Sequence, residues 1–132
     1  MKNTIIALDD MPYWLERMKN ELSAFPGYTV VAFASPREAL SFFEESEANV
    51  ALVVSDNQMN IGGRTFPNRG IELLQEIRWT AKSQEKIPLI LFTSEASSDQ
   101  RQRVRGLSGA VVLKKHSVSG ELLDKAREVL GL

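Results

Sequence analysis

Apolar residues along the chain follow two patterns, and these patterns alternate from one end to the other. Short runs rich in β-branched residues, typical of strands in a parallel sheet, occupy 4–8, 28–33, 49–55, 88–93 and 110–113. Between them, apolar residues recur every three or four positions, as on the buried face of a helix. The pattern predicts helices that start at Pro12 and after an N-cap at Ser35, and further helices at 70–81, 97–105 and 121–130.

This alternation predicts a doubly wound α/β fold. Right-handed crossovers between parallel strands place helices on both faces of one sheet. We therefore expect residues 1–132 to form a single domain around a five-stranded parallel sheet in the flavodoxin-like order 2-1-3-4-5. The least regular stretch, 57–69, contains Gly62-Gly63 and Pro67 and is predicted to be a loop. Loops of this length in a compact domain often have a function.

Composition and charge exclude several classes of function. With a net charge of −1, the chain has no strong electrostatic bias toward nucleic acid or an anionic membrane. It has no cysteine for a disulfide, a thiol nucleophile or a zinc–thiolate site. The first apolar run is too short for a signal peptide, and no apolar segment approaches the roughly 20 residues that cross a bilayer. We therefore expect a soluble cytoplasmic protein that binds neither nucleic acid nor membrane directly.

Polar residues of complementary chemistry follow four of the predicted strands. They are Asp9 and Asp10 after the first strand, Asp56 after the third, Thr93 and Ser94 at the fourth, and Lys114 and Lys115 after the fifth. In the expected strand order the first and third strands are neighbours, so the three acids should cluster at the edge where such sheets bind ligands. Clustered carboxylates raise one another's pKa unless a cation neutralises them, and Mg²⁺ suits such an all-oxygen site.

An acidic metal site combined with a lysine and a hydroxyl indicates phosphoryl chemistry. The metal and the ammonium offset charge on phosphoryl oxygens, and the hydroxyl donates a hydrogen bond to one of them. An aspartate can itself be the nucleophile and form an acyl phosphate, and Asp56, at the end of the most apolar strand, is the candidate. The chain has a single histidine, His116, shows no Ser/His/Asp triad and lacks the P-loop motif.

Taken in order, these stretches resemble the receiver (response regulator) domain of two-component signalling systems. The stretches that carry the resemblance are 8–10, 53–59, 70–78, 88–94, 113–115 and 121–123. Each stretch is a weak signal alone. Together they cover the whole chain at compatible spacing, which makes the resemblance specific.

The resemblance implies a role for each matched acid. Asp56 would accept a phosphoryl group from a histidine kinase or a histidine phosphotransfer protein. Asp10 and Asp56 would bind Mg²⁺, Asp9 would act on it largely through water, and the backbone carbonyl of Gln58 would complete the metal shell.

The resemblance also assigns the hydroxyl and the lysine. Thr93 would hydrogen-bond the phosphoryl group and act as the switch, and a lysine would pair with a phosphoryl oxygen. Spacing from 121–123 favours Lys115 over Lys114 for this role, whereas spacing from Gly109-Ala110 does not decide between them. The implied protein is a phosphoacceptor that alters a binding face for a downstream protein effector, and not a dedicated enzyme.

Departures from the family pattern motivate an alternative. Asn60 and His116 stand where the family usually has proline, Val112 stands at the usual aromatic switch position, and the stretch before Arg69 is longer than usual. The alternative is a pseudo-receiver, a binding module that keeps the fold and signals without phosphorylation. An aspartate-nucleophile phosphatase fits less well, because Gln58 occupies the position of the second acid that such enzymes use.

Overall fold

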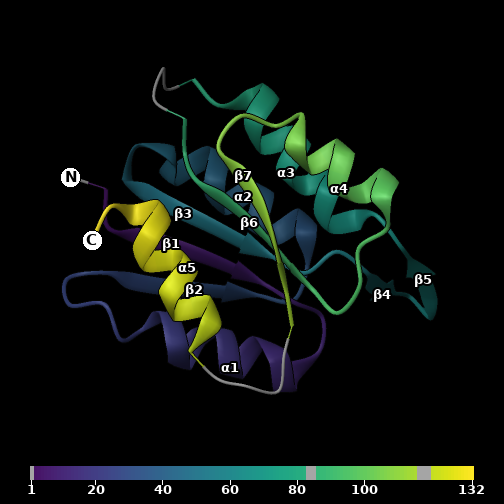
Figure 1. Ribbon diagram of the computed structural model, residues 1–132, viewed down its shortest axis with the longest axis horizontal. Coiled ribbons are helices and arrows are strands. Elements are labelled where there is room, and N and C mark those ends of the chain that lie inside the picture. The colour runs from purple at the N-terminus through teal and green to yellow at the C-terminus, as the bar shows by residue number, and fades with distance from the viewer. Residues whose placement is uncertain (1, 83–85, 116–119) are drawn as a thin grey trace.

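The computed structural model describes residues 2–82, 86–115 and 120–132, and it contains a five-stranded parallel sheet between two layers of helices (Figure 1). The strands of this sheet are β1 (Thr4–Leu8), β2 (Thr29–Phe33), β3 (Val50–Ser55), β6 (Leu89–Thr93) and β7 (Ala110–Lys114). Their order is β2-β1-β3-β6-β7. Because β6 and β7 are the fourth and fifth strands of this sheet along the chain, the predicted fold and strand order are confirmed.

Helices cover both faces of the sheet, as Figure 1 shows. One face carries α1 (Pro12–Leu22) and α5 (Glu121–Leu130). The other face carries α2 (Pro36–Ser46), α3 (Arg69–Thr80) and α4 (Ser98–Arg105). A short 3₁₀ turn, η1 (Glu47–Asn49), precedes β3. Successive strand residues alternate between the two cores, so Ile6 and Leu8 pack on the α2–α4 side whereas Ile5 and Ala7 pack on the α1–α5 side. No helix in the described ranges is long and apolar enough to cross a membrane.

The central strand β3 is buried along its whole length. It lies between β1 and β6, and helices cover both of its faces, which explains its continuous apolar sequence. The residues that follow β3 therefore emerge at the middle of the carboxyl edge of the sheet. This edge, where β1 also ends, is the place where open parallel sheets bind ligands.

The segment 57–69, predicted to be a loop, contains a β-hairpin. Strand β4 (Met59–Ile61) pairs antiparallel with β5 (Arg64–Phe66) and projects beyond the carboxyl edge of the sheet, at the right in Figure 1. Gly62 and Gly63 form its two-residue turn with φ values of 59° and 79°. Positive φ at both turn positions is the requirement of a type I′ hairpin turn, which glycine meets without steric cost. The sequence pattern did not predict these strands, because each has three residues and most of their side chains are exposed.

The N-terminus of α3 packs directly on the backbone that follows β3. The Gly70 amide donates to the Asn57 carbonyl at 2.9 Å, and the Ile71 amide donates to Asn57 Oδ1 at 3.1 Å. A Cβ at Gly70 would collide with the Asp56 carbonyl oxygen, so only glycine allows this approach. The start of α3 thus determines the direction in which the chain leaves β3 at Asp56.

We predict that Gly70→Ala lowers the free energy of unfolding by about 2–3 kcal/mol, because the added methyl group forces α3 away from the Asp56 backbone. Urea unfolding followed by circular dichroism measures this loss.

Gly106→Ala is the matched control. Gly106 has a φ of −71°, and a Cβ there would lie 3.4 Å from the Arg103 carbonyl oxygen, an ordinary contact. Its stability is expected to change by less than about 1 kcal/mol. If Gly70→Ala left the free energy of unfolding unchanged, the contact of α3 would not constrain the backbone at Asp56.

Candidate functional site

Three aspartates meet at the carboxyl ends of β1 and β3. Asp9, Asp10 and Asp56 each have one carboxylate oxygen that lies within 4.8 Å of the corresponding oxygens of the other two. Asp9 is fully buried, Asp56 is 6% exposed and Asp10 is half-buried. Like charges this close and this poorly solvated repel one another, and carboxylate oxygens are the ligands that Mg²⁺ prefers. The cluster therefore has the chemistry and spacing of a site for a hard divalent cation.

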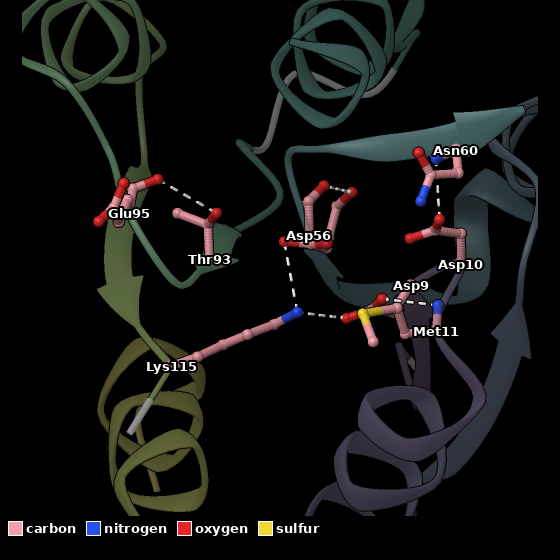
Figure 2. Close-up of polar contacts among 9 residues, drawn as sticks. Asp9, Asp10, Met11, Asp56, Asn60, Thr93, Glu95 and Lys115 are labelled. Atoms are coloured by element: carbon pink, nitrogen blue, oxygen red, sulfur yellow. Dashed lines mark hydrogen bonds and ion pairs between the residues drawn. The ribbon is translucent and has the colours of Figure 1, made fainter. Parts of the chain in front are cut away.

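Backbone amides hold two of these carboxylates in place. Asp9 Oδ1 accepts a hydrogen bond of 3.0 Å from the Met11 amide at the start of α1. Asp10 Oδ2 accepts one of 2.8 Å from the Asn60 amide in the hairpin (Figure 2). The second contact joins residues fifty positions apart and was not predicted, because the sequence pattern of 57–69 indicated a loop.

Lys115, directly after β7, places its ammonium group against the acids. Its Nζ lies 2.6 Å from Asp9 Oδ2 and 3.4 Å from Asp56 Oδ1, and its side chain is 3% exposed (Figure 2). The Nζ also lies 4.8 Å from the centre of the Trp14 ring, a cation–π contact with α1. Lys114 is exposed. Of the two candidate lysines, the structure therefore brings Lys115 into the acidic cluster.

Thr93 ends β6 and is 4% exposed. Its Oγ1 donates a hydrogen bond of 3.3 Å to the backbone carbonyl of Glu95, in the connection to α4 (Figure 2). The Thr93 carbonyl accepts a 2.9 Å bond from the Lys115 amide, which ties the end of β6 to the residue that supplies the ammonium group. The Thr93 hydroxyl is therefore at the site but is bonded to the loop beside it.

A cleft of about 740 Å³ opens above this cluster. Asp10, Asp56, Gln58, Thr93 and Lys115 all line it. Asp9, the sixth site residue predicted from the sequence, belongs to the same cluster and pairs with Lys115.

Residues to which the sequence assigned no role in the site also line the cleft. They are Asn60 and Pro67 from the 57–69 segment, and Gln100 and Arg101 from α4. One signal for this part of the cleft was present in the sequence. Ser97-x-x-Gln100 is a capping box, in which each side chain bonds the other residue's amide, at 3.1 Å and 2.9 Å.

Burial dominates the electrostatics of the site. Desolvation, followed by the nearby charge of Asp9, raises the pKa of Asp56 to about 6, although Lys115 opposes the shift. The pKa of Asp9 is also raised, again mainly by desolvation, while hydrogen bonds from Lys115 and the Met11 amide oppose the rise. One ammonium group thus fails to neutralise the buried acids, and a bound cation would relieve the remaining repulsion.

Comparison with known proteins identifies the fold and the family. The sequence pattern of the response regulator receiver domain matches residues 5–127. The chain belongs to the receiver domain family. No curated protein matches the sequence.

Solved structures share the fold of this chain. The chain is 22% identical to the chemotaxis protein CheY4 of Vibrio cholerae, with a TM-score of 0.76 over 98% of this chain and 99% of that one. A receiver domain protein from Clostridium thermocellum is also 22% identical, with a TM-score of 0.76 and coverage of 98% and 94%. A LuxR-family two-component response regulator from Aurantimonas is 26% identical, with the same TM-score and coverage of 99% and 86%.

Receiver domains are signalling domains that work with histidine kinases and effectors. In this receiver domain, Val112 of β7 is half-buried against the core on the α2–α4 side. His116 directly follows Lys115 and also departs from the family pattern, but it lies outside the described residues.

We predict that Asp56→Asn stabilises the receiver domain above pH 6. Since the folded-state pKa of Asp56, about 6, exceeds its ordinary value of 3.8, the folded state binds this proton more tightly than the unfolded chain. The free energy of unfolding therefore falls as the pH rises between these two values. The loss is on the order of 3 kcal/mol at neutral pH, and a neutral Asn avoids it.

Urea unfolding in EDTA at about pH 3.5 and about pH 7.5 separates this effect from metal binding, and the advantage of Asp56→Asn is expected only at the higher pH. Asp99→Asn, an exposed acid on α4, serves as the control and should stabilise the protein at neither pH. An equal gain for Asp56→Asn at both values would contradict the titration argument.

Proposed function

We propose that the chain is a single cytoplasmic receiver domain that is switched by Mg²⁺-dependent phosphorylation of Asp56. The observation that carries the proposal is the cluster itself, in which three carboxylates meet within 4.8 Å and the Lys115 ammonium lies 3.4 Å from Asp56. Family membership supports the signalling role. The open cleft above Asp56 offers a route for a phosphodonor.

The donor atoms of the cluster fit Mg²⁺. Asp10, Asp56 and the Gln58 backbone carbonyl would hold the ion, and Asp9 would act largely through water, which Mg²⁺ retains in most protein sites. When bound, the ion supplies positive charge that stabilises the oxygens of a transferring phosphoryl group. The raised pKa values of Asp9 and Asp56 support this assignment, because they show acids that their own lysine does not fully neutralise.

Asp56 would act as the nucleophile. The donor would be a phosphorylated histidine of a kinase or of a phosphotransfer protein. A carboxylate oxygen of Asp56 attacks the phosphorus, the P–N bond breaks as the new P–O bond forms, and the imidazole nitrogen takes up a proton. With a pKa of about 6, Asp56 is mostly ionised at neutral pH and able to attack. Lys115 would pair with a phosphoryl oxygen of the product.

Thr93 would transmit the change. Its hydroxyl now bonds the Glu95 carbonyl, and turning toward a phosphoryl oxygen would release that bond and let the connection to α4 shift. Because Val112 replaces an aromatic side chain, the shift would pass through this connection, α4 and β7 without an aromatic rotamer. The altered face would then bind a downstream protein effector, with no direct contact to nucleic acid or membrane.

We expect acetyl phosphate to add one phosphoryl group to the wild-type protein in the presence of Mg²⁺, and to add none to Asp56→Asn, because the amide cannot form the acyl phosphate. Intact mass measurement gives the answer directly, and omission of Mg²⁺ with EDTA present is the control. Equal uptake by both proteins would rule out Asp56 as the acceptor. A folded, Mg²⁺-binding wild type that takes up none from acetyl phosphate or a phosphorylated kinase would favour the pseudo-receiver alternative.

Lys115→Ala is expected to slow this phosphorylation at least about tenfold, since a charge-assisted hydrogen bond to the phosphoryl group contributes roughly 1.5–3 kcal/mol. Since Lys115 also lowers the pKa of Asp56, its loss should move the rise of the rate with pH to higher pH.

Lys114→Ala is the matched control, because its side chain is exposed and its removal should leave both the rate and the pH profile unchanged. Rates are taken from time courses of intact mass, after circular dichroism shows that both variants fold. If Lys114→Ala slowed phosphorylation and Lys115→Ala did not, the roles assigned to the two lysines would be reversed.

A further inference from the structure

One backbone hydrogen bond connects the β4–β5 hairpin to the acidic cluster. The Asn60 amide donates to Asp10 Oδ2 at 2.8 Å, as Figure 2 shows. Asp10 is the most exposed of the three clustered acids, and it lines the cleft together with Asn60. The carboxylate that is least constrained by burial is therefore held by a contact from the hairpin.

The pairing of the hairpin leaves this amide available. Around the two-residue turn, Ile61 pairs with Arg64 and Asn60 pairs with Thr65. In a two-residue hairpin the pair next to the turn exchanges backbone hydrogen bonds, and the following pair does not. The short bond of 2.6 Å between Thr65 Oγ1 and Asn60 Oδ1 agrees with the close side chains of such a pair. The Asn60 N–H therefore faces away from β5 and toward Asp10.

The hairpin is anchored on both sides of Asn60. Met59 is fully buried in the core on the α2–α4 side. After the hairpin, Asn68 Oδ1 accepts a 2.9 Å hydrogen bond from Gln100 Nε2, and Gln100 is itself held by the capping box of α4. Asn60 is thus a donor presented from a fixed backbone, and its position does not depend on a flexible side chain.

We propose that the Asn60 backbone amide is a positioning group for the metal site. Its N–H holds Asp10 Oδ2, which leaves the other carboxylate oxygen of Asp10 for the cation. The same hydrogen bond offsets part of the negative charge of Asp10. This inference rests on the proposed function, with Mg²⁺ as the ligand. It assigns the effect to the main chain of residue 60, so the side chain at that position should matter little.

Two substitutions at residue 60 separate the amide from the side chain. Asn60→Pro removes the N–H, and proline is tolerated where a strand N–H faces away from its partner. Asn60→Ala keeps the N–H and removes the bond to Thr65. Both are made in a Trp79→Phe background, so that Trp14, which contacts Lys115, is the sole tryptophan and reports on the site.

Titration with MgCl₂ followed by Trp14 fluorescence is expected to give about tenfold weaker affinity for Asn60→Pro and a value within about twofold of the parent for Asn60→Ala. Circular dichroism and urea unfolding establish that each variant is folded. If Asn60→Pro does not fold, the amide-to-ester analogue at residue 60, which replaces the N–H by oxygen, takes its place with the same expectation.

The outcomes distinguish this inference from the proposed function. A parent protein that binds no Mg²⁺ overturns both. Equal or tighter binding by Asn60→Pro overturns the positioning role and leaves the metal site intact. Weakening by Asn60→Ala to the same extent as by Asn60→Pro assigns the effect to the side chain and overturns the role of the amide.

Discussion

The ion pairs of Lys115 with Asp9 and Asp56 are the interaction on which the site depends. They join the ends of β1, β3 and β7, which are distant in the chain, through groups that are almost without contact with water. Buried charges are tolerated only when they are paired, so these contacts constrain how the three strand ends meet. One ammonium group contacts two of the three clustered carboxylates, and burial together with the charge of Asp9 still raises the pKa of Asp56 to about 6.

Two elements hold the site through backbone amides. The start of α3 holds the backbone after β3, because Gly70 lets its amide reach the Asn57 carbonyl while the Ile71 amide bonds the Asn57 side chain. The hairpin holds Asp10 through the Asn60 amide. By contrast, the Thr93 hydroxyl is bonded to a loop, a contact that can be exchanged at little cost. The site therefore combines fixed acids with one adjustable hydroxyl, an arrangement suited to a switch.

The hairpin also links the acids to α4. It touches Asp10 through Asn60, and the residues after it touch α4 through the bond between Asn68 and Gln100. In the proposed switch, Val112 in place of an aromatic side chain leaves less bulk on β7 for Thr93 to displace. The hairpin offers a second physical connection between the cluster and the same helix, formed by main-chain and side-chain hydrogen bonds and not by a rotating ring.

The sequence by itself determined the fold and most of the site. Hydrophobic periodicity decides which face of each element is buried, parallel strands end at a common edge, and these two rules predict where Asp9, Asp10, Asp56 and Thr93 lie. Tertiary structure decided the rest. Spacing along the sequence could not decide whether Lys115 or Lys114 enters the site, because the segment before them differs in length by about one residue from the family pattern. The three-dimensional structure decides it, since Asp9 and Asp56 both pair with the ammonium group of Lys115. The hairpin and its bond to Asp10 were hidden because strands of three residues, most of them exposed, carry no clear periodicity, and because the bond joins backbone and side chain fifty residues apart.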